Sequence, residues 1–396
     1  MEAKDAGGGK SSMQTQAGRA NTGENSRHGM PADPRAAERD RPSIGEIDVR
    51  VTSFDLPGLG VIDCMAVTTD GTLVVCTITA LYTVSRGGLK TLLAGHTTRA
   101  GFTDGKGGAA RFDGPGGIVV DSAGNVLMSD RNNHSLRKVT RTGAVSTLAG
   151  NGTRGYQDGV GDAARFNRPL GIAVDADGTI YVADCGNSCV RQVAPDDGAV
   201  STLAGDGKKG TGFADGLGLT ARFYGPTALA LDTHGNLLVS DSENDSIRRV
   251  TTAEGRVTTV AGRRQSSRGF ADGEGVVARF YSPIGIAVDG NNNIFVADTL
   301  NNRIRMIVGA AARVTTVVGS GQPGKVNGTS STARFNEPWA LAFDERGRLL
   351  VADNNQSCVR VLEASLLPPR QIPAVRVLLL QVRACSPRTQ WCACCR

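Results

Sequence analysis

The chain has 396 residues, of which 40% are apolar and 21% charged, and this composition excludes a wholly unfolded polypeptide. Glycine accounts for 52 residues, roughly twice its usual share of about 7%, without the three-residue period of collagen. The formal net charge is +6, but residues 363 to 396 alone carry five Arg and one Glu, so the part before them is nearly neutral. A domain built around a nucleic-acid backbone is therefore not favoured.

The two ends differ in composition from the middle. Residues 1–46 are polar and contain no apolar segment typical of a secretory signal, which predicts a disordered arm and an intracellular, cytoplasmic protein. Residues 366–396 form a tail with cysteines crowded at its end, also expected to be disordered. Its longest apolar stretch, 374–382, contains an arginine and is too short to span a bilayer. The folded domain is expected to cover 47–365.

A repeat of about 55 residues fills this domain. The triplet Ala-Arg-Phe recurs, and a proline follows each phenylalanine by three residues. After the proline come an apolar strand, a tight turn with Asp or Gly, a second strand ending in Asp, and two more short strands. The segment 169–205 is the clearest copy. The phenylalanines that mark the copies are Phe112, Phe166, Phe223, Phe280 and Phe335.

Four short antiparallel strands cannot bury both faces of their sheet alone, so the repeats must stack on one another. Repeats of this size predict the blades of an all-β propeller around a central channel. Five clear copies and a degenerate one at 65–95 predict six four-stranded blades. The last copy lacks a fourth strand, which residues 47–52 can supply to close the ring, with 374–382 as the alternative.

These repeats resemble the NHL family, named for an Asn-His-Leu run after the second strand. The runs at 133–136 (Asn-His-Ser-Leu) and 302–304 (Asn-Arg-Ile) are close variants, and 171–175 (Gly-Ile-Ala-Val-Asp) is similar to the family's first strand. The first blade departs from the pattern, with Thr77 where other copies have Asp and no Arg in its third strand. The resemblance implies a six-bladed propeller used mostly for interaction. Some relatives bind RNA, protein or cell-wall material, and six-bladed cousins include an amidating lyase and calcium-dependent lactonases.

Residues that every blade carries are expected to be architecture, because an asymmetric ligand needs only one copy of each contact. In each copy the Asp that ends the second strand is followed by an amide three residues later and by an Arg seven residues later. We expect the amide to satisfy turn backbone groups and the Arg to pair with this Asp or with neighbouring acids. The phenylalanine is expected to be a wedge between blades. The aspartates are Asp130, Asp184, Asp241, Asp298 and Asp353.

The variable positions indicate the candidate binding surface. In a propeller the loops between second and third strands and the links between blades emerge on one face, and loops on a rigid scaffold commonly carry function. The loop residues that differ between blades are Arg131, His134, Cys185, Glu243, Asp245, Leu300 and Asn354. The links add the densest group of cations, Lys208, Lys209, Arg263, Arg264 and Arg268. This charge favours an acidic protein segment as the partner.

Catalysis and RNA binding remain as alternatives. Only His96 and His134 are expected near the candidate face, too few for the histidine-bound metal of a lyase, and the starts of the five clear inner strands carry no calcium ligands. No catalytic or metal-ligating residue and no cofactor is therefore assigned. Aromatic residues are only 5% of the chain, a poor supply for stacking RNA bases. Of the nine cysteines, Cys185 and Cys189 are expected to be free thiols, and no disulfide framework is predicted. The sequence favours a monomeric, non-catalytic scaffold for a protein or peptide.

Overall fold

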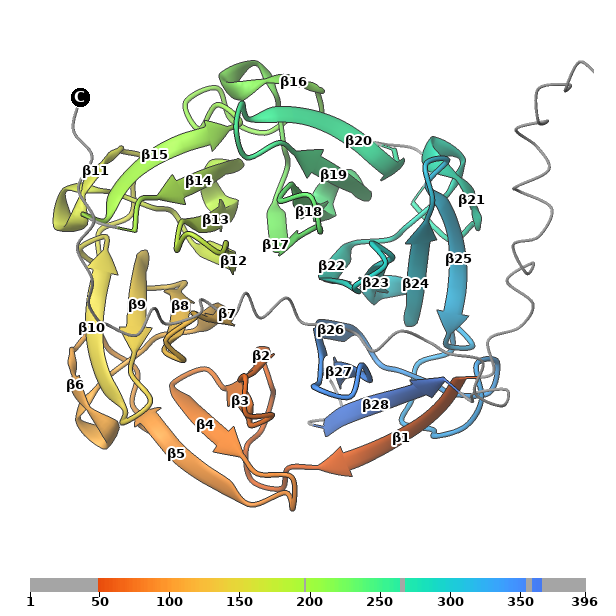
Figure 1. The fold of residues 1–396 in the computed structure, drawn as a ribbon, viewed down its shortest axis with the longest axis horizontal. Coiled ribbons are helices and arrows are strands. Elements are labelled where there is room, and N and C mark those ends of the chain that lie inside the picture. Colours follow the sequence, from red (N-terminus) through yellow and green to blue (C-terminus); the bar gives the residue numbers. More distant parts are fainter. Residues whose placement is uncertain (1–48, 196, 264–267, 354–357, 365–396) are drawn as a thin grey trace, which may run out of the picture. The chain divides into compact units, whose positions relative to one another are not determined.

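A computed structural model describes residues 49–195, 197–263, 268–353 and 358–364. These residues fall in one compact unit, Ile47–Arg396. They form six antiparallel sheets arranged as blades around a central axis, which confirms the six-bladed all-β propeller (Figure 1). In this part of the chain no helix is long and apolar enough to cross a membrane. The expected arm 1–46 and tail 366–396 lie outside the described residues.

Each blade places its first strand next to the axis and its fourth strand at the rim (Figure 1). The innermost strands are β2 (Cys64–Val67), β7 (Pro115–Val120), β12 (Pro169–Val174), β17 (Pro226–Leu231), β22 (Pro283–Val288) and β26 (Pro338–Phe343). The second strands are β3 (Leu73–Cys76), β8 (Val126–Asp130), β13 (Ile180–Asp184), β18 (Leu237–Asp241), β23 (Ile294–Asp298) and β27 (Leu349–Asp353). These second strands are almost wholly buried, since both of their faces pack on neighbouring blades.

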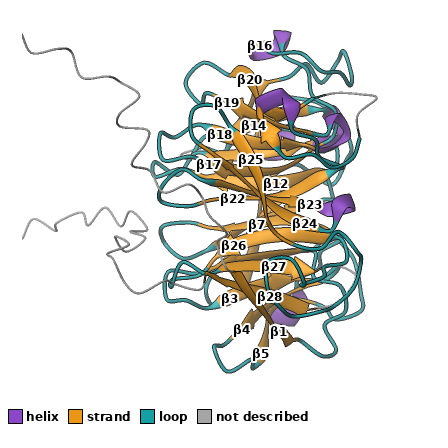
Figure 2. Cartoon of the chain, turned by 90° about the vertical axis from the view of Figure 1, so that its right-hand side faces the viewer, coloured by secondary structure: helices purple, strands orange, loops and turns teal. Residues whose placement is uncertain are grey.

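The two outer strands of each blade follow the same order. The third strands are β4 (Ala80–Val84), β9 (Ser135–Val139), β14 (Cys189–Val193), β19 (Ser246–Val250), β24 (Arg303–Val308) and β28 (Cys358–Ala364). The fourth strands are β5 (Lys90–Gly95), β10 (Ala144–Ala149), β15 (Ala199–Ala204), β20 (Arg256–Gly262), β25 (Arg313–Val318) and, from the other end of the chain, β1 (Val49–Asp55). Viewed edge-on, loops leave the strands on both sides of the disc (Figure 2).

The links between blades differ from the expectation, because they do not stay on one face. In four blades the link runs down the outer edge and adds a fifth strand of two residues: β6 (Gly105–Lys106), β11 (Gly159–Val160), β16 (Gly216–Leu217) and β21 (Gly273–Glu274). A short 3-10 turn follows each: η1 (Gly107–Ala109), η2 (Gly161–Ala163), η4 (Gly218–Thr220) and η6 (Gly275–Val277). The fifth strand satisfies backbone groups of the rim strand, which would otherwise leave an open sheet edge.

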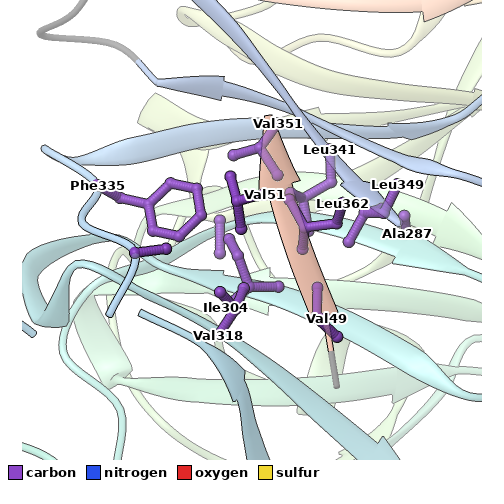
Figure 3. Close-up of a cluster of buried hydrophobic side chains, with 12 residues drawn as sticks. Val49, Val51, Ala287, Ile304, Val318, Phe335, Leu341, Leu349, Val351 and Leu362 are labelled. Atoms are coloured by element: carbon purple, nitrogen blue, oxygen red, sulfur yellow. The ribbon is translucent and has the colours of Figure 1, made fainter. Parts of the chain in front are cut away.

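The amino-terminal strand closes the ring, as expected. β1 pairs antiparallel with β28 from Val49 opposite Ala364 to Asp55 opposite Cys358, so it is the outer strand of the sixth blade. The Val51 N–H donates to Gly328 O at 2.8 Å, which fastens β1 to the preceding link as well. Val51 packs among buried side chains of the fifth and sixth blades (Figure 3). Closure is therefore noncovalent and uses both hydrogen bonds and apolar contact.

The repeated phenylalanines are wedges between blades. Phe166 is fully buried and packs against Leu136 of the second blade and Val182 of the third. Near the axis the blades approach so closely that only glycine fits at Gly171, where an added Cβ would lie 2.6 Å from the Cα of Ala228. The small residues of the inner strands are therefore required by crowding at the axis.

The first blade is built differently at the points where its sequence departs from the repeat. Its link is short, and Leu56 and Ile62, each 1% exposed, fill the space before the blade where other blades have the phenylalanine. Its two inner strands are joined by a disulfide between Cys64 and Cys76, which lie directly opposite each other with Cα atoms 5.3 Å apart. The sequence had not indicated this pair, because the register that brings two cysteines together is a property of the folded sheet.

We predict that removing the closing strand destabilises the ring. Deleting residues 1–55 takes away β1, leaves the edge of β28 unpaired and exposes the apolar cluster around Val51, so the melting temperature falls and the protein aggregates. Deleting residues 1–46 leaves β1 in place and serves as the matched control. Thermal melts and size-exclusion chromatography of the two truncations check this, and equal stability would contradict the assignment of β1.

We also predict a large cost for removing one wedge. Phe166→Ala leaves a cavity in the interface between the second and third blades and lowers the free energy of unfolding by about 3 to 5 kcal/mol. Glu243→Ala, which removes a half-exposed side chain, changes it by about 0 to 1 kcal/mol. Chemical denaturation measures both. An unchanged free energy of unfolding in Phe166→Ala would show that the wedge interpretation is wrong.

Candidate functional site

In the five blades with the clear repeat, the repeated Asp, Asn and Arg form a buried network of hydrogen bonds and ion pairs, which we call the staple. Arg191 is fully buried and donates to Asp184 of the same blade at 2.9 Å and to Asp158 of the link at 2.5 Å. The other oxygen of Asp184 accepts the backbone N–H of Asn167 at 2.8 Å, and Asn187 bridges Asp184 to the link carbonyl of Gly155. The expected structural role of these residues is confirmed.

The same staple recurs with a buried arginine in five blades: Arg137, Arg191, Arg248, Arg305 and Arg360. In four of them a link aspartate also binds the arginine: Asp104, Asp158, Asp215 and Asp272. Each of these link aspartates stands in an Asp-Gly pair that is typical of a turn, so their role as partners of the arginine is visible only in the fold. The sixth blade has Asn327 at this position, and Asn327 accepts from Arg360 at 3.2 Å.

In four blades aromatic rings cover both faces of this guanidinium group, whereas Arg360 of the sixth blade packs on Phe335 alone among the described residues. Arg191 lies between Tyr156 at 5.0 Å and Phe166 at 5.3 Å from the ring centres. The partners on the link side in the other blades are Phe102, Phe213 and Phe270. In the sequence, an aromatic residue stands two positions before each link aspartate, and this regular spacing could have indicated the contact. These aromatics are therefore engaged in cation–π packing.

We call the loop face the side formed by loops 77–79, 131–134, 185–188, 242–245 and 299–302 together with the adjoining ends of the links. The amide of Asn133 donates to Gly101 O of the link at 2.7 Å, and Asn187 makes the same contact with Gly155. Loops and link ends therefore do meet on one face, as expected. Three of the loops contain a 3-10 turn: η3 (Cys185–Asn187), η5 (Ser242–Asn244) and η7 (Thr299–Asn301).

Two of the candidate binding residues tie neighbouring blades together. His134 Nδ1 accepts the backbone N–H of Arg168 at 3.1 Å, and Asp245 Oδ1 accepts that of Ser282 at 2.8 Å. Both have left-handed backbones, φ 50° and 51°, and Asn302 makes the equivalent contact one blade further on. Partial burial and nearby arginines lower the pKa of His134, which suits a neutral acceptor. His134 and Asp245 thus have a structural role at this face.

The predicted basic cluster is partly neutralised in the structure. Lys209 pairs with Asp206 at 3.3 Å, and Arg268 pairs with Asp245 at 3.3 Å and with Glu243 at 3.5 Å. Lys208 and Arg263 are exposed and have no carboxylate within 4 Å among the described residues. Arg264 and Asn354 lie outside the described residues.

The mouth of the central channel opens at the loop face. The starts of the six inner strands enclose a cavity of about 100 Å³, lined largely by glycine and aliphatic residues, with the indole of Trp339 and the side chain of Leu170 among them. The first blade contributes Asp63. This residue was not among the sequence candidates, because calcium ligands were sought only at the starts of the five clear inner strands. Burial raises the pKa of Asp63 to about 6, and the charge of Arg131 acts in the opposite direction.

Cys185 lies near this mouth as a free, partly exposed thiol. Burial raises its pKa to about 11, the neighbouring Asp184 adds to this, and Arg131 and Arg168 oppose it. At neutral pH the group is therefore a thiol and a poor nucleophile. Cys189 in the adjoining strand is also free and wholly buried.

We predict slow alkylation of Cys185. A rise of about two pKa units above the usual value of 9.0 lowers the thiolate fraction at pH 8 about 100-fold, and that fraction then grows tenfold per pH unit up to about pH 11. Iodoacetamide labelling followed by peptide mass spectrometry gives the rate, with a free cysteine-containing peptide as control. Fast labelling at pH 8 would contradict the raised pKa.

Large apolar side chains are exposed at the loop face. Ile78 is 57% exposed, and Tyr224 and Leu300 are each 41% exposed. Backbone hydrogen bonds hold all three beside the starts of inner strands: Gly114 donates to Ile78 O, Glu243 donates to Tyr224 O, and Leu300 donates to Tyr281 O. Of these, only Leu300 was among the sequence candidates. No group of three or more His, Cys, Asp or Glu in the described ranges is arranged to hold a metal ion.

Comparison with known proteins identifies the class. The NHL repeat model matches residues 112–139, 166–193, 280–305 and 335–362, which lie in the second, third, fifth and sixth blades. The chain therefore carries NHL repeats in these four blades, within a six-bladed propeller fold.

Individual relatives share fewer than 30% of the aligned residues with this chain. The chain is 29% identical over 308 residues to the Arabidopsis thaliana protein suppressor of quenching 1, chloroplastic, covering 74% of this chain and 29% of that protein. It is 26% identical over 349 residues to human NHL repeat-containing protein 2, covering 66% of this chain and 48% of that protein. The chain thus spans less than half the length of these curated relatives.

Solved structures support the fold alone. An auxiliary nutrient binding protein from Bacteroides thetaiotaomicron aligns with a TM-score of 0.61 at 15% identity, covering 80% of this chain and 76% of that one. A streptogramin B lyase aligns with a TM-score of 0.52 at 14% identity, covering 81% of this chain and 99% of that one. Binding proteins and enzymes thus share this architecture, and the fold does not decide between them.

Proposed function

We propose that the propeller is a non-catalytic scaffold that binds a protein or peptide partner through its loop face. The observation that carries this proposal is the exposure of Ile78, Tyr224 and Leu300, which backbone hydrogen bonds hold in place beside the channel mouth. A rigid face with fixed apolar side chains and a charged surround has the composition of a protein interface, in which aromatic and apolar groups form the core and polar groups the rim.

The buried staples also support this proposal, because they show which residues are not available for binding. The repeated Asp, Asn, Arg and aromatic residues are used within the blades, so the parts that vary between blades are left for recognition. Of the candidates named from the sequence, Arg131, Cys185, Leu300, Lys208 and Arg263 remain available at the loop face, whereas Glu243 is paired with Arg268. The propeller is proposed to act as a monomer. Its intracellular, cytoplasmic location stays a prediction, and the Arabidopsis relative carries the description chloroplastic.

RNA binding is the first alternative. Single-stranded RNA needs aromatic platforms in a positive groove. The link aromatics Phe102, Tyr156, Phe213 and Phe270 each cover a buried arginine, which leaves at most their outer surfaces for a base. This use favours a protein partner over RNA.

A lyase or lactonase activity is the second alternative, since similar folds include a streptogramin B lyase and a putative gluconolactonase. The channel mouth offers Asp63 as a carboxylate, but its other described lining residues supply few side-chain donors, chiefly the Thr227 hydroxyl and the indole N–H of Trp339. A hydrolase or lyase needs a positioned acid, base or metal close to the reacting bond. The chemistry of the lining therefore supports binding more than catalysis.

We predict that charging the apolar positions of the loop face abolishes partner capture. The full chain carrying Ile78→Asp and Leu300→Asp loses its partner, because two buried carboxylates in an interface are strongly unfavourable. The control is Leu89→Asp, which charges a residue 71% exposed in the turn between β4 and β5 on the opposite face. The measurement is affinity capture from native lysate, treated or untreated with nuclease, with quantitative mass spectrometry of the captured proteins.

Capture that survives nuclease, is lost in the double variant and is kept in Leu89→Asp supports the scaffold. Loss of all captured protein on nuclease treatment would favour the RNA alternative. Equal capture by wild type and the double variant would contradict the assignment to the loop face.

A further inference from the structure

The links before the fourth and fifth blades keep only part of the free positive charge that the sequence predicts there. Lys209 and Arg268 are paired with acids, as described above. Three arginines of the second and third blades, Arg131, Arg154 and Arg168, are exposed and have no carboxylate within 4 Å in the described part of the chain. We call these three the arginine cluster.

The three side chains come together from separate segments. Arg131 begins the loop after β8, Arg154 lies in the link that follows β10, and Arg168 directly precedes β12. The backbone of Arg168 is fastened to His134 at 3.1 Å, which brings the start of the third blade against the loop of the second. The positions are therefore set by the tie between blades.

The three arginines lie around the same two loops, which carry His134 and Cys185. Gly186 donates to Asn167 O, next to Arg168, at 2.8 Å, and Asn187 of the same loop donates to Gly155 O, next to Arg154, at 2.8 Å. The charges of Arg154 and Arg168 lower the pKa of His134, and those of Arg131 and Arg168 oppose the raised pKa of Cys185. Arg168 thus links the other two, and the cluster spans the junction of the second and third blades beside the channel mouth. Like charges held together without counterions form a local positive field, which attracts an anionic partner.

The nearby acids do not cancel this field. Glu243 also acts on Cys185, but Arg268 already pairs with it at 3.5 Å. Asp63 at the channel mouth and Asp113, which accepts the amide of Asn132 at 2.9 Å, lie beside Arg131, but neither carboxylate forms an ion pair with the three arginines. Asp184 is enclosed in the staple with Arg191. Three exposed guanidinium groups therefore remain to bind carboxylates from outside, and guanidinium forks suit carboxylates in paired hydrogen bonds.

We propose that the arginine cluster is the anchor for an acidic segment of the partner protein, bound across the junction of the second and third blades by carboxylate–guanidinium pairs. This inference rests on the proposed scaffold function and names its partner's chemistry. The apolar side chains of the loop face lie around the same channel mouth, so the acidic segment docks the partner while Ile78, Tyr224 and Leu300 contact its apolar surface.

The test uses the full chain and two defined probes, a fluorescein-labelled octaglutamate peptide and a labelled oligouridine of eight nucleotides, measured by fluorescence anisotropy at 25 and 150 mM NaCl. The variant is Arg131→Gln, Arg154→Gln and Arg168→Gln together. The backbone N–H of Arg168 remains, so the tie to His134 is kept and the melting temperature is unchanged. The matched control removes three exposed cations away from the loop face, Lys106→Gln, Arg141→Gln and Arg313→Gln, for the same change in net charge.

The expected result is octaglutamate binding by wild type that weakens with salt, falls at least tenfold in the cluster variant and changes less than twofold in the control. The inference is overturned if wild type does not bind octaglutamate at 25 mM NaCl, or if both triple variants weaken it equally. It is also overturned if oligouridine binds more tightly through the same three arginines, which identifies an RNA surface.

Lysate capture separates this inference from the function on which it rests. If the cluster variant captures the same protein as wild type while Ile78→Asp with Leu300→Asp does not, the scaffold stands and the acidic anchor is wrong. If neither variant changes capture, the assignment of the loop face itself fails.

Discussion

The buried ion pair between a third-strand arginine and a second-strand aspartate is the interaction on which the blades depend. Arg191 reaches from β14 to Asp184 and out to Asp158, and two aromatic rings enclose its guanidinium. Removing a charge from water costs several kcal/mol, which the paired carboxylates and carbonyl acceptors offset here, so a single loss inside this group leaves a buried charge uncompensated. The staple therefore fixes the path of the link relative to the blade and, with it, the shape of the loop face.

The ring is completed by a different kind of contact. The first blade has neither the buried arginine nor the phenylalanine wedge, and it uses Leu56, Ile62 and the Cys64–Cys76 disulfide instead. The sixth blade takes its outer strand from the other end of the chain, and its link has Lys325 and Asn327 where other links place an aromatic and an aspartate. Lys325 pairs with Asp55 of that outer strand. The two ends of the propeller are thus held by local substitutes for the repeated staple.

Hydrogen bonds between neighbouring blades hold the loop face in one conformation, which suits the proposed binding of a partner. His134, Asp245 and Asn302 fasten one blade to the next through backbone N–H groups, so the residues beside them have fixed positions. A preformed surface loses little conformational entropy on binding. The same ties also gather Arg131, Arg154 and Arg168 at one junction, and there the electrostatic character of the face arises from tertiary contacts.

The sequence by itself determined the architecture, because the period of the Phe and Pro positions and the short apolar strands leave stacked blades as the way to bury both sheet faces. It also identified the Asp, Asn and Arg of the staple, and it offered residues 47–52 as the closing strand, with 374–382 as the alternative. The tertiary structure alone decided which charges remain free. Lys209 and Arg268 are cations in the sequence but are paired in the fold, whereas Arg131 and Arg168 meet across two blades. Charge pairing and the opposition of Cys64 to Cys76 depend on distances between segments far apart in the chain, and a linear pattern does not contain those distances.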